Sequence, residues 1–178
     1  GVETQVEALA PETCTDAQGR IHVVWYDKRG GVNAVWYNRS IDGGTSWQTG
    51  DTQLNLGSDG AAMLPTIACV DNRVYVVWQD HRDGELENGN IYFNYSNDSG
   101  STFLANAVAL DADPEGENIS LAPQIAAVGS AVHVVWFDAR NGAYDIYANS
   151  STDGGDTWQP TPVRVDGGEA GAALTSIE

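Results

Sequence analysis

The sequence predicts an all-β fold built from three copies of one repeat, and three observations support this. A motif of the form Ser-x-Asp-x-Gly-x-Ser/Thr-aromatic occurs three times, with its aspartate at positions 42, 98 and 153. A short valine-rich run ending in tryptophan precedes each copy. No window shows a sustained apolar period of about 3.6 residues, so we expect little helix. Self-similarity at a nearly fixed spacing is typical of a repeat architecture.

Each repeat is expected to contain four short strands. It opens with a proline-led segment of small apolar residues, and the valine-rich run that follows is β-branched and aromatic, as strands are. A turn leads to a third apolar segment, and the Asp motif then closes a hairpin into a fourth. The expected strands cover residues 11–14, 21–25, 34–37 and 52–56 in the first repeat, 65–70, 74–78, 91–95 and 107–110 in the second, and 123–128, 132–136, 146–148 and 162–165 in the third.

Four-stranded units at this spacing are typical of β-propeller blades. The chain is therefore predicted to be a single β-propeller segment of three four-stranded antiparallel blades, covering residues 11–60, 61–118 and 119–170. Residues 1–10 are expected to form a spare fourth strand, and residues 171–178 the start of a further first strand. Three blades cannot close a ring, so we expect a homo-oligomer or polymer, or a segment of a longer chain.

The composition indicates a soluble, acidic surface. The 178 residues include 25 acidic and 8 basic side chains, a formal net charge of −17. Such a surface repels nucleic acid and anionic lipid, and it suits a secreted protein, cation binding or high salt. No apolar run reaches about 18 residues, so no membrane span is expected. The chain opens without a signal peptide, as a mature or excised form does.

The three motifs resemble the Asp-box, or BNR, repeats of sialidase-like propellers. The wider pattern, Val-x-Val-Val-Trp-x-Asp-x-Arg followed by Ile-Tyr and the Asp box, is similar to BNR-repeat proteins of microbial secreted and surface proteins. The resemblance covers essentially the whole chain. It implies a sialidase-like propeller, typically of six blades, at an extracellular or cell-surface location. It implies little about activity, because one propeller fold hosts many functions.

The resemblance also implies that the Asp boxes are structural. The aspartate can accept hydrogen bonds from turn amides, the glycine supplies a positive φ, and the aromatic residue packs under the hairpin. The expected structural residues are Ser40, Asp42, Gly44, Trp47, Ser96, Asp98, Gly100, Phe103, Ser151, Asp153, Gly155 and Trp158.

An Asp-x-Arg sequence follows each valine-rich strand and is the candidate ligand site. If the Asp boxes lie on one face, these turns open on the opposite face, where sialidase-like propellers hold their ligands. The pairs could bind an anionic or polar sugar there. Their repetition favours the alternative, a salt bridge that locks each turn, because a ligand site breaks symmetry. The candidate residues are Asp27, Arg29, Asp80, Arg82, Asp138 and Arg140.

The sequence assigns no catalytic residue. Sialidases of this fold use three arginines, a tyrosine with a glutamate partner and an aspartate, together with a Phe/Tyr-Arg-Ile-Pro motif. Here Arg20-Ile21-His22 lacks both the aromatic residue before it and the proline after it. We therefore expect a non-catalytic propeller module for assembly or binding, completed by other chains through strand exchange. The alternatives are a sialidase-type glycoside hydrolase or a sugar-binding lectin with a site opposite the Asp boxes.

An acidic loop is a candidate calcium site. Asp111, Asp113 and Glu115 alternate, and Gly116 stands sixth, as in the first half of a calcium loop. The twelfth position is Ala122, which cannot complete the site. A solvated acidic loop is the alternative, and calcium is the one cofactor that the sequence suggests.

Two further features concern secretion. Cys14 and Cys69 fall at matching places in two repeats, and we expect small buried apolar residues rather than metal ligands, with a disulfide left open. Five Asn-x-Ser sequons could carry glycans if the host glycosylates secreted proteins. Their asparagines are Asn38, Asn94, Asn97, Asn118 and Asn149.

Overall fold

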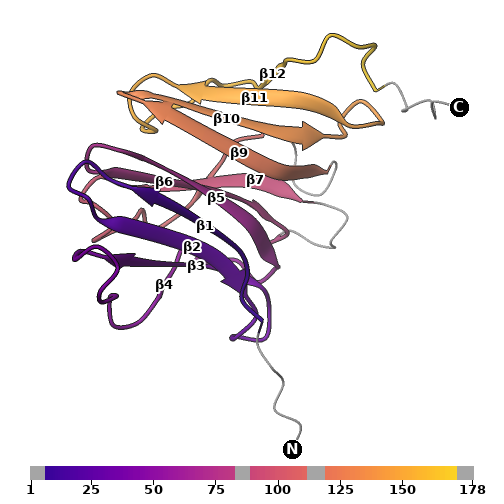
Figure 1. Ribbon diagram of the computed structural model, residues 1–178. Helices are drawn as coiled ribbons and strands as arrows, with labels where there is room; N and C mark the ends of the chain where they lie inside the picture. The colour runs from indigo at the N-terminus through magenta and orange to yellow at the C-terminus, as the bar shows by residue number, and fades with distance from the viewer. Residues whose placement is uncertain (1–6, 83–88, 112–118, 172–178) are drawn as a thin grey trace, which may run out of the picture.

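The computed structural model describes residues 7–82, 89–111 and 119–171, which form twelve strands in three four-stranded antiparallel sheets (Figure 1). These described residues contain no helix, and hence none that could cross a membrane. The predicted all-β class and the three four-stranded blades are confirmed.

Each sheet follows the chain order, so that every strand pairs with the next. The first blade contains β1 (Leu9–Thr15), β2 (Ile21–Asp27), β3 (Ala34–Ser40) and β4 (Thr52–Gln53). The second contains β5 (Ala62–Val70), β6 (Arg73–Asp80), β7 (Asn90–Ser96) and β8 (Val108–Ala109). The third contains β9 (Ser120–Val128), β10 (Ala131–Asp138), β11 (Asp145–Ser151) and β12 (Val163–Arg164).

The outermost strands are shorter than predicted, with two residues in each. A side chain closes the next rung of the ladder in every blade. The amide of Val35 donates to Asn55 Oδ1 at 3.1 Å, and the amide of Ile91 donates to Asp111 Oδ2 at 2.9 Å. A side-chain acceptor satisfies the amide in place of a backbone carbonyl, so regular pairing ends there.

The first strands of the blades form the inner edge of the molecule. β1, β5 and β9 lie next to one another in that order, and the other strands of each blade extend away from them (Figure 1). Because antiparallel strands alternate in direction, the turns after the first and third strands share one end of each blade. We call this end the Asp-box face. The turns after β2, β6 and β10 and the starts of the inner strands lie at the opposite face.

Two apolar clusters join the blades, and the second blade contributes to both. Along β6, Val74, Val76 and Trp78 pack toward the first blade, whereas Tyr75 and Val77 pack toward the third. Successive side chains point to opposite sides of a strand, so β6 is covered on both sides. The middle blade therefore sits between two interfaces of the same kind.

The third blade is covered on one side. Val132 and Val134 of β10 are buried against the second blade, whereas His133, Val135 and Phe137 between and beyond them are exposed. This alternation marks a strand with one packed side and one open side. No further blade covers that side in the part of the chain that the structure describes.

Each inner strand contains an irregularity at the same place. The residue before a proline has a left-handed backbone, with φ of 47° at Ala10, 51° at Leu64 and 49° at Ala122. The pairing of the inner strand shifts register there. A bulge bends a strand, so all three inner strands bend near the opposite face.

The predicted end strands fall largely outside the described residues. Of residues 1–10, the structure describes residues 7–10, and β1 begins at Leu9, which pairs with Tyr26 across the bulge. Of residues 171–178, it describes residue 171 alone. Strand exchange through these ends stays a prediction.

Candidate functional site

The Asp boxes lock the hairpins between third and fourth strands. In the first blade, Asp42 Oδ1 accepts hydrogen bonds from the Ser46 amide at 2.8 Å and the Ser40 hydroxyl at 2.8 Å. Its Oδ2 accepts a bond from the Ser46 hydroxyl at 2.6 Å, and Ser40 Oγ accepts the amide of Gly44. Asp98 and Asp153 repeat these contacts in the other blades. The carboxylates are committed to their own turns.

The hydrogen bonds make these carboxyl groups strongly acidic. The Ser46 hydroxyl, the Ser46 amide and the Ser40 hydroxyl lower the pKa of Asp42 to about 2. The Thr157 side chain and amide, with Ser151, do the same for Asp153, also to about 2. Hydrogen bonds to the charged form of an acid favour ionisation, so the Asp42 and Asp153 carboxylates are ionised at neutral pH and hold their turns.

The second and third Asp boxes are also held by the blade before them. Arg20 and Arg39 of the first blade donate to Ser99 of the second box. Arg73 of the second blade donates to the carbonyl of Gly154 at 2.6 Å, and Tyr95 bonds Asp156. This role was not predicted. Its signal in the sequence is that Arg20, directly before β2, and Arg73, the first residue of β6, occupy matching positions in their repeats.

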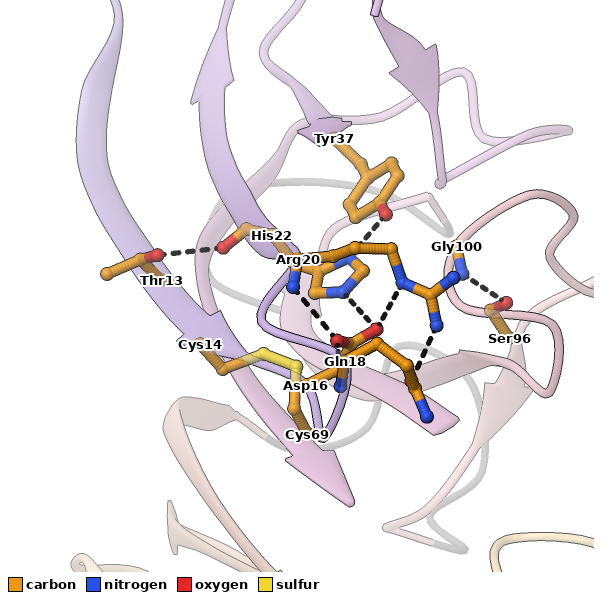
Figure 2. Close-up of a disulfide and its surroundings, with 10 residues drawn as sticks. All are labelled: Thr13, Cys14, Asp16, Gln18, Arg20, His22, Tyr37, Cys69, Ser96 and Gly100. Carbon is orange, nitrogen blue, oxygen red and sulfur yellow. Dashed lines mark hydrogen bonds and ion pairs between the residues drawn. A yellow bond between two sulfur atoms is a disulfide. The ribbon is translucent and has the colours of Figure 1, made fainter. Parts of the chain in front are cut away.

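A buried polar network lies beneath this contact, next to a disulfide (Figure 2). His22 Nδ1 lies 2.7 Å from the Tyr37 hydroxyl, and His22 Nε2 lies 3.2 Å from Asp16 Oδ2. Arg20 Nε donates to the same Asp16 oxygen at 2.7 Å. Because a carboxylate only accepts, the imidazole proton belongs on Nε2, and Nδ1 accepts from the tyrosine hydroxyl.

The side chains of this hydrogen-bond network are buried, which indicates a structural role. His22 and Tyr37 are fully buried, and Asp16 is 6% exposed. Burial lowers the pKa of His22 and raises that of Tyr37, so both rings are neutral. Burial opposes ionisation of Asp16, but hydrogen bonds from Arg20 and His22 outweigh it and hold the pKa below its usual value. The network lies within the first blade, and it holds in place Arg20 and Tyr37, which contact Ser99 and Phe103 of the second blade.

Cys14 on β1 and Cys69 on β5 form the disulfide that the sequence left open. The pairing registers place Cys14 opposite His22 and Cys69 opposite Val74, so the two cysteines are offset by one residue and do not occupy matching positions. Their Cα atoms lie 5.7 Å apart, within the range that a disulfide requires. The bond joins the first two blades at their inner edge.

The Asp-Arg pairs are internally satisfied. Asp138 accepts hydrogen bonds from the Trp136 indole at 2.8 Å, the Arg140 amide at 3.0 Å and the Arg140 guanidinium at 2.6 Å. Burial opposes its ionisation, but the bonds from Arg140 and Trp136 hold its pKa below the usual value. Asp27 and Asp80 have the same kinds of partner and are at most 2% exposed. This geometry suits a turn lock.

An aromatic ring of the third strand completes each lock. The arginine carbon Cζ lies 4.3 Å from the ring centroid of Trp36 in the first blade, 3.7 Å from Tyr92 in the second and 4.3 Å from Tyr147 in the third. A guanidinium over a ring is attracted by its electron-rich face. The structure thus gives each arginine both a carboxylate and a ring within its own blade.

The residues around these locks differ between blades. Before the aspartate stand Tyr26, Gln79 and Phe137, and between aspartate and arginine stand Lys28, His81 and Ala139. The second blade is distinctive: Gln79 Nε2 lies 3.2 Å from His81 Nε2, and Gln79 Oε1 accepts the Ala122 amide at 3.1 Å. Gln79 and His81 are buried, at the start of the third blade's inner strand. The opposite face is therefore asymmetric, whereas the Asp-box locks are repeated.

One structural observation, on Asp111, bears on the predicted calcium site. Asp111 is 1% exposed, and its Oδ2 accepts the Ile91 amide. Asp113 and Glu115 lie outside the described residues, and within the described ranges no cluster of three or more metal-ligating side chains occurs. The first expected ligand thus ends the pairing of β7 with β8.

In three of the five sequons, the asparagine side chain is engaged in hydrogen bonds within the fold. Asn94 Nδ2 donates to the Leu104 carbonyl at 3.0 Å, and Asn149 Nδ2 to the Leu110 carbonyl at 2.9 Å. Asn38 Nδ2 likewise donates to Gln48, and all three asparagines are buried. A glycan is attached at this nitrogen, so modification at these three positions would have to replace hydrogen bonds of the fold, and glycosylation stays a prediction. Asn97 is exposed, and Asn118 lies outside the described residues.

Comparisons with known proteins show the fold. No protein-family model and no curated protein matches the sequence. Among solved structures, the chain is similar to a Penicillium chrysogenum α-L-arabinanase complexed with arabinobiose, with a TM-score of 0.63 and 16% identity over 88% of this chain and 49% of that one. It is similar to the GH93 α-L-arabinofuranosidase of Fusarium graminearum with arabinobiose, with a TM-score of 0.68 and 16% identity over 92% and 49%.

A third similar structure is a family 117 glycoside hydrolase of the marine bacterium Zobellia galactanivorans, with a TM-score of 0.57 and 13% identity over 84% of this chain and 53% of that one. The chain spans about half the length of these structures. At such identities the likeness establishes the fold alone, a β-propeller architecture that these glycoside hydrolases share.

Proposed function

We propose that the chain is a carbohydrate-binding segment of an extracellular, sialidase-like β-propeller, with its ligand on the face opposite the Asp boxes. The fold is one that carbohydrate-active enzymes use. The Asp boxes support the sialidase-like assignment, because their locks recur in all three blades.

The asymmetry of the opposite face carries this proposal. A structural device repeats from blade to blade, whereas a ligand site needs different groups at matching positions. The repeated Asp-Arg locks are the scaffold, and the residues that vary beside them are the candidates for recognition. Gln79 and His81 are buried and hydrogen-bonded within the fold, so the leading candidate is Lys28, whose exposed ammonium group can donate to sugar hydroxyls.

The disulfide supports the extracellular location. Disulfides persist in oxidising compartments and are rare in the cytosol of most organisms. Cys14 and Cys69 pair, and the described residues contain no other cysteine.

Calorimetric titration with arabinobiose, and separately with a sialoside, tests the binding function. We expect heat of binding with at least one sugar, and about tenfold weaker binding by Lys28→Ala, because a lost polar contact costs about 1.4 kcal/mol. Gln159→Ala changes an exposed polar residue next to the third Asp box, and this control should bind normally. Absence of heat with both sugars, together with a blank glycan array, would refute the proposal.

A glycoside hydrolase is the second candidate, and the similar structures favour it at the level of the fold. Turnover of a chromogenic α-L-arabinofuranoside or a fluorogenic sialoside by the purified chain would establish it. The aspartates of the three turn locks are engaged by their own arginines, so Asp138→Asn is expected to change stability more than turnover. A structural assembly module is the third candidate, and the exposed sides of the end blades favour it.

A further inference from the structure

Both interfaces between blades use the same three contacts. A third-strand aromatic ring of the earlier blade meets the Asp-box aromatic ring of the later blade edge to face. These ring centroids are 4.7 Å apart for Tyr37 and Phe103 and 4.8 Å apart for Phe93 and Trp158. An arginine at the start of the second strand reaches the later Asp box, as does the residue before the third-strand serine. These residues are Arg20 and Arg39 at one interface and Arg73 and Tyr95 at the other.

The first blade presents the receiving half of this interface. Its Asp-box tryptophan, Trp47, is 45% exposed, whereas the corresponding Phe103 and Trp158 meet the ring of a preceding blade. Val23, Trp25, Asn38 and Trp47 line an open hollow of about 270 Å³ on this side. We call this surface the receiving side of the first blade.

The burial of matching residues shows what the receiving side fits. Trp78 and Trp136, which match Trp25, are 0% and 1% exposed because a preceding blade covers them. Trp25 itself is half-buried. A row of partly exposed tryptophans on one sheet face therefore continues an interface that already occurs twice in the molecule.

The third blade lacks the matching half. The positions of Arg20, Tyr37 and Arg39 hold small residues there. They are Ala131, Ala148 and Ser150. The exposed side of β10 keeps Val135 and Phe137, but the third blade has no aromatic ring at the position of Tyr37 and no arginine or tyrosine at the positions of Arg20 and Arg39.

We propose that the receiving side of the first blade docks a propeller blade other than these three. Its occupant carries an aromatic residue at the position of Tyr37, an arginine at that of Arg20 and an arginine or tyrosine at that of Arg39. The third blade of a second copy is not the occupant. An arginine-bearing partner also complements the net charge of −17.

Introducing the missing interface residues into the third blade tests this proposal. The variant Ala131→Arg/Ala148→Phe/Ser150→Tyr gives the third blade the contact residues of the second. We expect the native chain to sediment as single copies and the triple variant to associate head to tail. Adding Trp47→Ala to the triple variant should weaken that association by about thirtyfold or more, as loss of a central interface tryptophan does. Trp47→Ala alone should leave the native chain unchanged in mass.

Two results would overturn the proposal. One is a native chain that already associates and loses association with Trp47→Ala, which would make a second copy the occupant. The other is a triple variant that melts like the native chain but sediments as single copies. If the triple variant does not fold, Ala131→Arg/Ser150→Tyr decides by the same two measurements, because it omits the largest increase in side-chain volume, Ala148→Phe, at the middle of β11.

Discussion

The central glycine of each Asp box has one backbone conformation but different surroundings. φ is 91° at Gly44, 75° at Gly100 and 91° at Gly155, a region that glycine favours. A methyl group on Gly100 would collide with the Tyr37 hydroxyl of the preceding blade, whereas on Gly44 it would meet only Ile21 at 3.6 Å. The difference arises because the second box is covered by a blade and the first is not.

Alanine at these two glycines should therefore have unequal effects. Gly44→Ala is expected to lower the free energy of unfolding by about 1 kcal/mol, from backbone strain alone. Gly100→Ala adds overpacking against Tyr37 and should cost about 3 kcal/mol. Urea unfolding of both variants measures the difference. Equal losses would mean that the first blade does not press on the second Asp box.

The Asp-box carboxylates make a second prediction at this scale. The pKa of Asp42 and of Asp153 is about 2, below the ordinary value of 3.8. A depressed pKa contributes stability that is present above 3.8 and is lost as the pH falls through about 2. Relative to an unstructured peptide at the same pH, the amides of Ser46 and Thr157 should therefore stay protected from exchange at pH 4 and lose protection near pH 2. Asp42→Asn, which cannot ionise, should remove the pH dependence of this protection at Ser46 and leave it at Thr157.

At the scale of a single turn, the Asp-Arg lock after β10 is also tied to its surroundings, because Arg140 donates to the Asp111 carbonyl at 2.9 Å and the Ser120 hydroxyl donates to Asp138 Oδ2 at 3.3 Å. The Asp138 carboxylate holds the Trp136 indole and the Arg140 guanidinium, and the Tyr147 ring covers the arginine. Removing one partner of a buried ion pair leaves the other uncompensated. Repetition of the pair in every blade agrees with this structural role, because a ligand site breaks symmetry.

Asp138→Ala should accordingly lower the free energy of unfolding by about 3 to 5 kcal/mol. Asp59→Ala makes the same change of charge at an exposed position between β4 and β5 and should change stability by less than about 0.5 kcal/mol. Chemical unfolding of the two variants provides the comparison. A loss below about 1 kcal/mol for Asp138→Ala would show that the pair is not a structural lock.

At the scale of the whole molecule, the strands and turns that recur in each repeat could be predicted from the sequence, whereas the contacts that join one blade to the next could not. Periodic apolar runs and the Asp boxes sufficed for twelve strands in three blades, because strand patterns and turn chemistry are local. Contacts between blades, such as Arg73 with Gly154, link residues far apart in the chain and leave no local pattern. The contact between Gln79 and His81 was not predicted, because these two residues have no counterparts in the other repeats.

The bond between Cys14 and Cys69 gives a prediction for the joined blades. It closes a loop with a sequence separation of 55 and ties β1 to β5 at the inner edge. By the chain-entropy account, a loop of this length stabilises the folded state by about 4 kcal/mol. The double variant Cys14→Ser/Cys69→Ser should lose this amount in urea unfolding, and the reduced native chain should match it.

Amide exchange along β2 distinguishes the contribution of the disulfide from that of the buried hydrogen-bond network beside it. His22, Tyr37 and Asp16 lie at the same junction but do not depend on the sulfur atoms for their hydrogen bonds. We therefore expect the reduced chain to keep the slow amide exchange of the His22 strand while its unfolding midpoint falls. Reduction that leaves the midpoint unchanged would mean that the buried network alone joins the first two blades. Fast exchange along β2 after reduction would instead make the disulfide a condition for that network to form.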